Sequence, residues 1–183
     1  MSIESNHQSI VLAGGCFWCI EALYKKVEGV LKITSGYAKS DNDNLALEDQ
    51  RAPTYEEVCS GTTVYAEVVK LDFDPTKISL EALLKIFFEI HDPTTLNKQG
   101  GDVGTQYRSA VFYTSDEQKN IAEDAHTEAQ ENWNDPIVTD ISHLHVFYPA
   151  EDYHQDYYSK NPNQPYCVAI ISPKIEKFLK KNN

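Results

Sequence analysis

The stretch "SIVLAGGCFWCIEALYKKVEG", residues 9–29, contains a complete change of local structure. It begins with an apolar run typical of a buried strand, and a pair of glycines ends that run. Apolar side chains then recur at helical spacing until Gly29 closes the segment. The recurring positions are Ile20, Leu23, Tyr24 and Val27. The sequence therefore predicts a strand, a glycine turn and a helix, with Cys16 at the start of the helix.

Strand and helix patterns alternate along the rest of the chain. Helix caps are predicted at Ser79 and at Ser115, which forms a capping box with Gln118. Further strands are predicted at residues 30–34, 65–73, 108–114 and 137–141, and a polar acidic loop at 40–51. No repeat or linker divides the 183 residues. We expect one α/β or α+β domain over residues 1–183, with its core at about 9–160 and a mobile tail after it.

The composition of the chain argues against nucleic acid and membranes as binding partners. The net charge of −12 argues against binding to a nucleic-acid backbone, which usually requires a basic surface. We expect no signal peptide, because the first residues lack a basic start and an apolar core. No apolar run is long enough to span a bilayer, and the acidic net charge argues against an anionic membrane surface as a partner. The four cysteines are expected to be reduced in a cytoplasmic protein, with catalysis or metal binding as their use.

Cys16 is a candidate nucleophile. The free N–H groups and the dipole at a helix start favour a thiolate over a thiol. The paired glycines before it let a substrate approach the backbone closely. A buried structural cysteine is the plain alternative.

Glu67 is a candidate general acid. In "YAEVVKLDF", residues 65–73, it falls among the apolar positions rather than with Lys70 and Asp72. Burial on that face would raise the pKa of its carboxyl, so that it holds a proton near neutral pH. A Glu on a solvated strand edge is the alternative interpretation.

Two further segments carry polar groups outside any regular pattern. The glycine-punctuated stretch "GGDVGTQYRS", residues 100–109, contains Asp102 and Tyr107, and Tyr55 lies in "PTYEEV", residues 53–58. Such loops are often only structural connections, and Tyr55 could serve in packing alone.

Seven motifs follow one another in a fixed order. They are "GCFW" (15–18), "SGY" (35–37), "PTYEEVCSG" (53–61), "AEVV" (66–69), "HDPTT" (91–95), "DVGTQYRS" (102–109) and "YHQDYYSKNP" (153–162). Together the motifs closely resemble the peptide methionine sulfoxide reductase A family, from about residue 10 to residue 173. The resemblance implies a two-layer sandwich with a mixed sheet, flanking helices and a ferredoxin-like core.

The resemblance also implies roles for single residues. Cys16 attacks the sulfur of methionine S-sulfoxide, free or in a protein, and Phe17 and Trp18 enclose the substrate methyl group. Glu67 donates a proton to the sulfoxide oxygen, Tyr55 and Tyr107 donate hydrogen bonds to it, and Asp102 helps to organise the site. The reaction leaves a sulfenic acid that a second thiol captures as a disulfide, which thioredoxin then reduces. No metal or organic cofactor is implied.

Three cysteines are candidates for the second thiol: Cys19, Cys59 and Cys167. Cys19 stands where the family commonly has glycine, and a helical residue there is expected to point around the helix from the pocket. Cys167 follows a stretch rich in Pro and Asn, 161–165, which lets a tail swing over a site. We therefore predict a Cys16–Cys167 disulfide, with Cys19 as a second-stage or alternative partner, and interpret Cys59 as structural.

Two other functions fit parts of the sequence. A thioredoxin-like thiol–disulfide oxidoreductase is typified by CxxC at a helix start, but it leaves Glu67 and residues 102–109 unexplained. A structural zinc module would take its ligands from Cys16, Cys19, His143 and His145, although the "HLH" spacing fits poorly. The remaining histidines and most of the 11 tyrosines are interpreted as packing or surface residues.

Overall fold

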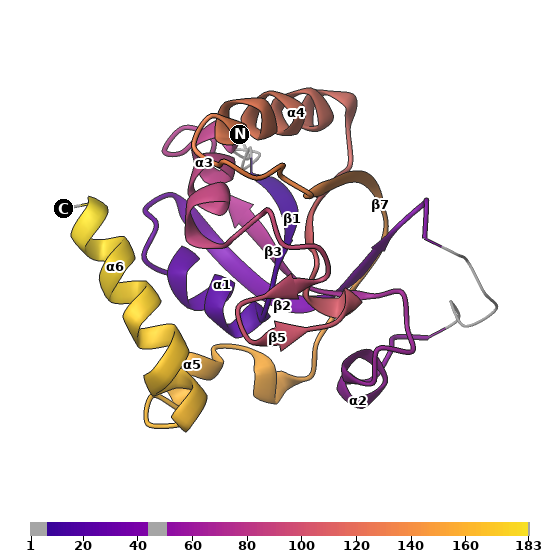
Figure 1. Cartoon of the computed structure of the whole chain (residues 1–183), viewed down its shortest axis with the longest axis vertical. Helices are drawn as coiled ribbons and strands as arrows, with labels where there is room; N and C mark the ends of the chain where they lie inside the picture. Colours follow the sequence, from indigo (N-terminus) through magenta and orange to yellow (C-terminus); the bar gives the residue numbers. More distant parts are fainter. Residues whose placement is uncertain (1–6, 44–50, 183) are drawn as a thin grey trace, which may run out of the picture.

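The computed structural model describes residues 7–43 and 51–182, and five strands in it form a closed barrel. In barrel order these strands are β1 (Gln8–Gly14), β3 (Ala66–Phe73), β2 (Val30–Ser40), β7 (Asp140–Pro149) and β6 (Ser109–Tyr113). The barrel closes because β1 pairs with β3 on one edge and with β6 on the other. All neighbouring pairs are antiparallel except β6 and β7. Figure 1 labels β1, β2, β3 and β7 of the barrel.

The closed barrel corrects the expectation of a two-layer sandwich with a ferredoxin-like core, although the sheet is mixed and helices flank it. Small side chains are the physical reason that the barrel can close. A buried cluster of strand residues fills the interior: Val11, Ala13, Ala38, Ala66, Val68, Ala110 and Phe112. Few strands enclose little space, so alanine is needed where strands face each other across it. Ala38 and Ala66 are register partners on β2 and β3.

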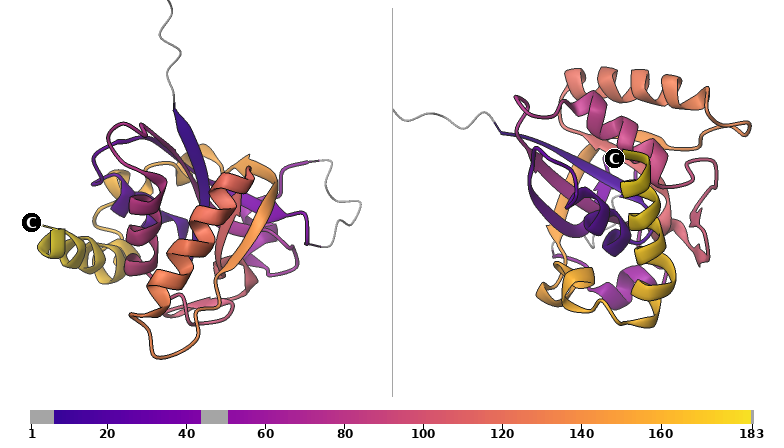
Figure 2. Two further views of the ribbon diagram at one scale, coloured as in Figure 1. Left: turned by 90° about the horizontal axis from the view of Figure 1, so that it is seen from above. Right: turned by 90° about the vertical axis from the view of Figure 1, so that its left-hand side faces the viewer.

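Helices cover the outside of the barrel. They are α1 (Phe17–Tyr24), α3 (Leu80–Ile90), α4 (Asp116–Gln130) and α6 (Ser172–Asn182). Figure 2 shows α4 above α3 on one side and α6 along the side of the molecule beside α1. A larger buried cluster joins the outer face of the strands to α1 and α3, and it includes Phe17, Val69, Leu71 and Phe87. Both faces of β3 are therefore buried over its first four residues.

The predicted helix starts are confirmed. The Ser79 hydroxyl accepts a hydrogen bond from the Ala82 N–H at 3.2 Å, and Ser115 accepts from the Gln118 N–H at 3.3 Å. The Gln118 side chain accepts from the Thr114 N–H rather than from that of Ser115. Each cap satisfies an N–H that the first helical turn leaves without a partner.

Two strands differ from the predicted ranges. The strand expected at 30–34 continues to Ser40, and the one expected at 137–141 begins at Asp140 and runs to Pro149. The added residues of β2 and β7 pair with each other, so tertiary pairing determines their lengths. Residues 44–50 of the expected acidic loop, and residues 1–6, lie outside the described residues.

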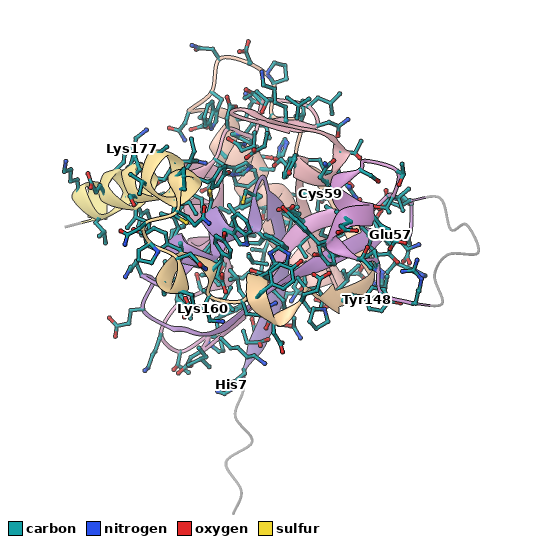
Figure 3. All side chains as sticks on the ribbon, turned by 90° about the horizontal axis from the view of Figure 1, so that it is seen from below. His7, Glu57, Cys59, Tyr148, Lys160 and Lys177 are labelled. Atoms are coloured by element: carbon teal, nitrogen blue, oxygen red, sulfur yellow. The ribbon has the colours of Figure 1, made fainter. Side chains whose placement is uncertain are left out.

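Shorter elements connect the main strands and helices. They are α2 (Tyr55–Cys59), β4 (Lys98–Gln99), β5 (Asp102–Val103), the 3-10 turns Thr105–Tyr107 and Asp152–His154, α5 (Tyr157–Lys160) and the π-helix Cys167–Ile171. The π-helix runs into α6, so most of the segment expected as a tail is helical and packs on α1. Figure 3 shows α2, with Cys59 and Glu57, on the side of the molecule away from α6, which carries Lys177. In the described part of the chain, no helix has the length and apolar character needed to cross a membrane.

Candidate active site

Cys16 is the N-cap residue of α1. The chain turns from β1 into this position at Gly15, whose φ of 90° is unfavourable for other residues. A Cβ atom at Gly15 would lie 2.6 Å from the Gln99 side chain, so a larger residue does not fit. Strand, turn and helix therefore have the predicted order, and Gly15 brings the thiol to the start of α1.

The Cys16 thiol lies in contact with a second thiol. Cys16 and Cys19 hydrogen bond to each other, and the Cys19 N–H donates to the Cys16 carbonyl at 3.1 Å. Because N-cap and third helical positions face the same side, Cys19 lies beside Cys16, whereas a helical residue there was expected to point around the helix from the pocket. Both residues are buried, at 9% and 2% exposed.

Burial also changes the acidity expected for the pair. It raises the pKa of the Cys16 thiol well above its usual value, and neighbouring Cys19 and Glu67 act in the same direction. The hydrogen bond with Cys16 lowers the pKa of Cys19. Desolvation by burial therefore opposes the thiolate that the helix start was expected to favour at Cys16.

Glu67 lies at the same helix start. Its Oε2 accepts a hydrogen bond from the Phe17 N–H, the first of α1, at 3.2 Å, and the residue is 2% exposed. Desolvation raises the pKa of this carboxyl to about 8, partly opposed by the bond from Phe17. The predicted burial of Glu67 is confirmed, and the carboxyl is mostly protonated at neutral pH.

Two tyrosines reach the site from separate elements. Tyr55 is the first residue of α2, which a Thr54–Glu57 capping box fixes, and Tyr107 ends the 3-10 turn at Thr105–Tyr107. Burial raises the pKa of both phenols, and Glu67 contributes to each increase. Both hydroxyls therefore stay protonated. The Cys59 thiol hydrogen bonds to both tyrosines, so this cysteine lies beside the site rather than apart from it.

Asp102 connects the loop to the C-terminal segment. Its Oδ2 accepts a hydrogen bond from the Tyr166 hydroxyl at 2.7 Å. The same hydroxyl lies 3.8 Å from the Cys19 sulfur. Tyr166 directly precedes Cys167, which is fully buried in one apolar cluster with Cys16 and Cys19. The structure therefore brings all three candidate redox thiols together in reduced form.

An aromatic wall borders the thiols on the other side. Phe17 is 1% exposed, and the Trp18 ring stacks on Tyr157 with centroids 3.7 Å apart and planes 5° apart. Tyr166 meets the Trp18 ring edge-on at 6.0 Å. The predicted pair Phe17 and Trp18 is therefore part of a larger aromatic group.

Sequence reasoning missed His154 and its partners. The Trp18 indole N–H donates to His154 Nδ1 at 3.1 Å, so the ring hydrogen is on Nε2, which is buried and has no hydrogen-bond partner among the described residues. His154 also packs on Tyr55, with ring centroids 4.4 Å apart. Glu151 accepts from the Tyr55 N–H at 2.9 Å and from the Tyr37 hydroxyl at 2.8 Å. The segment containing His154 and Glu151 has no apolar period, and only its motif "YHQDYYSKNP" pointed to it.

His143 and His145, the histidines of the zinc alternative, both contact Asp41. His143 Nδ1 and His145 Nδ1 lie 2.7 and 2.8 Å from the two carboxylate oxygens of Asp41. All three residues are partly or fully exposed. Across residues 7–43 and 51–182, no three or more His, Cys, Asp or Glu side chains are arranged to hold a metal ion.

Known proteins resemble the chain over nearly its whole length. A family model described as peptide methionine sulfoxide reductase matches residues 8–183. The relative named peptide methionine sulfoxide reductase MsrA from Ruthia magnifica is 51% identical over 172 residues, covering 94% of this chain and 98% of its own. The protein of the same name from Saccharolobus solfataricus is 51% identical over 169 residues, covering 92% and 91%.

Solved structures agree with this match. Reduced Mxr1 from Saccharomyces cerevisiae has a TM-score of 0.82 at 38% identity, covering 90% of this chain and 91% of Mxr1. Mxr1 in complex with Trx2 has a TM-score of 0.59 at 29% identity, covering 84% and 86%. A thioredoxin-like enzyme is not favoured, because these similarities extend over the whole barrel and not only over the CxxC segment. The chain is an oxidoreductase that belongs to the peptide methionine sulfoxide reductase family.

Proposed function

We propose that this protein reduces methionine S-sulfoxide, free or within proteins, with Cys16 as nucleophile and Glu67 as proton donor. One observation carries the proposal: a buried, protonated carboxyl hydrogen bonds to the first N–H of the helix that begins at a buried thiol. A nucleophilic sulfur and an acid are thus held at one helix start. Together they can attack a sulfoxide sulfur and protonate its oxygen.

The two sides of the site suit the two ends of a methyl sulfoxide. The apolar methyl group fits the aromatic wall of Phe17 and Trp18, whose rings lie 6.3 Å apart. The oxygen needs donors, and Glu67, Tyr55 and Tyr107 are all protonated near neutral pH. In this proposal Asp102 organises the donor side by fixing the loop that leads to Tyr107.

The oxygen transfer balances without another reactant. The Cys16 sulfur bonds to the substrate sulfur as Glu67 protonates the sulfoxide oxygen. The S–O bond of the substrate and the transient S–S bond then both break, an S–O bond to Cys16 forms, and methionine leaves. The thiol hydrogen passes to the Glu67 carboxylate, and the sulfenic acid carries the proton that Glu67 gave to the oxygen, so Glu67 ends the step protonated. Methionine sulfur is reduced and Cys16 is oxidised by two electrons.

A second thiol then captures the sulfenic acid with release of water. The contact between Cys16 and Cys19 supports Cys19 as the first partner, which reverses the order expected from the sequence. Cys167 lies in the same buried cluster, and it is placed to exchange with that first disulfide. We propose that this relay carries the disulfide to the C-terminal segment.

Thioredoxin is the proposed reductant. The Mxr1 structure that contains Trx2 supports this choice, because its Mxr1 chain resembles the present one over most of its length. A dithiol of the thioredoxin type would open the disulfide and return both thiols to the reduced state. A cytoplasmic location, where such reductants act, is part of the proposal.

The test is an activity assay that separates the stereoisomers. Peptides carrying methionine S-sulfoxide or R-sulfoxide are incubated with the protein and a thioredoxin system, and methionine is measured by chromatography. We expect methionine from the S isomer only. Equal conversion of both isomers, or conversion of neither, would contradict the proposal.

A further inference from the structure

Glu21 is a buried carboxylate on α1 that the proposed chemistry does not use. The residue is 2% exposed, and its Oε1 accepts a hydrogen bond from the Asp156 N–H at 2.8 Å. It also accepts from the N–H of Tyr157, the next residue. These two N–H groups open α5, where the Asp156 side chain makes no capping bond of its own. Glu21 therefore does for α5 what an N-cap side chain does for other helices.

The backbone that Glu21 holds is in an unfavourable conformation. Asp156 has a φ of 57°, in the left-handed region that residues with a side chain seldom adopt. Lys25 on the surface of α1 forms an ion pair with the Asp156 carboxylate. The ion pair is about one-third exposed on each side, so it is expected to contribute little. The buried bonds from Glu21 are the stronger restraint on this turn.

The turn determines where the next ring lies. Tyr157 leaves Asp156 at an angle that brings its ring flat against Trp18, with centroids 3.7 Å apart and planes 5° apart. Trp18 is a wall of the proposed methyl pocket and also donates to His154. A displaced Tyr157 would free one face of the indole and loosen that wall.

We propose that Glu21 is a positioning residue for the substrate pocket. Through Asp156 it holds Tyr157 against Trp18, and it does not touch the substrate. This inference rests on the proposed function, since it takes Trp18 as part of the sulfoxide pocket. It assigns Glu21 to binding of the methyl group rather than to the proton transfers, so its loss should alter KM more than the chemical step.

The test compares variants at each point of this chain of contacts. Glu21→Ala removes both acceptors, and Glu21→Gln keeps one of them. Lys25→Ala is the matched control, because it removes only the surface ion pair with Asp156. Tyr157→Leu removes the stacked ring directly. For each variant, KM and the single-turnover rate at saturating sulfoxide are measured, together with thermal unfolding.

Fluorescence gives a reading that does not depend on activity. The sequence has two tryptophans, so in a Trp133→Phe background Trp18 is the only emitter. Glu21→Ala and Tyr157→Leu are expected to shift the Trp18 emission in the same way, because each exposes the same face of the indole. Lys25→Ala is expected to leave the emission unchanged. This comparison stands even if the protein reduces no sulfoxide, so failure of the inference is separable from failure of the proposed function.

The expected kinetic result is a KM about tenfold higher in Glu21→Ala, the scale of losing one aromatic contact, with the saturating rate within about twofold. Glu21→Gln should fall between Glu21→Ala and the parent. The double variant Glu21→Ala, Tyr157→Leu should lose no more than Tyr157→Leu alone, since both changes act on one contact. Additive losses in the double variant, an unshifted Trp18 emission in Glu21→Ala, or an unchanged KM would overturn the inference.

Discussion

The Cys16 thiol and the Glu67 carboxyl each hold a proton that the proposed reaction must move. Burial raises the pKa of Cys16 well above its usual value, and it raises the pKa of Glu67 to about 8. Each group is therefore neutral in the free protein, which avoids a buried charge. A sulfoxide oxygen that accepts the Glu67 proton leaves a carboxylate able to receive the thiol proton. Desolvation thus prepares a proton exchange rather than a permanent thiolate.

The pH dependence of Glu67 provides the first prediction. Because its pKa is raised to about 8, the carboxyl holds its proton below that pH and loses it above. The single-turnover rate of sulfoxide reduction should therefore fall as pH rises through about 8. Glu67→Gln should be about 10²-fold slower, the usual scale for loss of a general acid, and should lack that decline. Rapid-quench measurements from pH 6 to 9.5 give both results.

A near-normal rate in Glu67→Gln, or a parent rate that is flat across pH 8, would remove Glu67 as the acid. Asp72→Asn is the control for a change of charge on the same strand, because Asp72 is partly exposed and lies away from α1. It should keep the parent profile.

Local pattern pointed to two residues of the candidate site that lie at or on regular elements. Cys16 was predicted from a strand, a glycine turn and a helix, and Glu67 from the alternation of β3. His154 and Glu151 were not found, because they lie in irregular chain and meet Tyr55 and Trp18 only after folding. The prediction that Cys16 favours the thiolate missed the effect of burial for a related reason. Helix position is visible in a sequence, whereas desolvation depends on packing.

At the level of elements, closure of the barrel was beyond sequence reasoning. β1 and β6 are paired between Gly14 and Ser109, which lie far apart in the chain. Neither strand has a local sequence signal for this pairing. The apolar patterns of both strands fit an open sheet as well as a closed barrel. One feature of the sequence is consistent with closure: four of the strands each place an alanine in the barrel interior. These residues are Ala13, Ala38, Ala66 and Ala110. Strand and helix type were largely predictable, and strand length and closure were not.

The barrel interior gives a second prediction. Ala66→Leu places a larger side chain opposite Ala38, where the interior has no room, and it should lower the free energy of unfolding by about 1–3 kcal/mol. Ala52→Leu is the matched control, because Ala52 is exposed. Urea unfolding followed by circular dichroism compares the two. Equal stability of both variants would mean that the barrel interior at Ala66 is not filled.

The C-terminal segment gives a third prediction. Cys167→Ser should still reduce about one sulfoxide per chain, because oxygen transfer precedes disulfide exchange. If Cys19 captures the sulfenic acid first, Cys167→Ser should form a Cys16–Cys19 disulfide in high yield and lose most thioredoxin-supported turnover. Non-reducing peptide mapping after one turnover identifies the linkage. Full recycling in Cys167→Ser would show that the Cys16–Cys19 disulfide is itself the substrate of thioredoxin.

At the scale of the whole molecule, the barrel serves as a rigid support for one end of α1. β1 leads into Cys16, β3 carries Glu67, and β2 carries Tyr37, which fixes Glu151. The donor tyrosines come from α2 and from the loop before β6, and the C-terminal segment adds Tyr166 and Cys167. The redox thiols are therefore enclosed by parts of the chain from both ends (Figure 1).

The most direct test of the central claim is a single turnover without reductant. The fully reduced protein is mixed with one equivalent of a peptide carrying methionine S-sulfoxide, in the presence of a sulfenic-acid trap, and the products are quantified by mass spectrometry. We predict about one methionine per chain and oxidation at Cys16, as trapped sulfenic acid or as a disulfide, with neither product in Cys16→Ser. Methionine formed while Cys16 stays reduced, or formed equally by Cys16→Ser, would contradict the account.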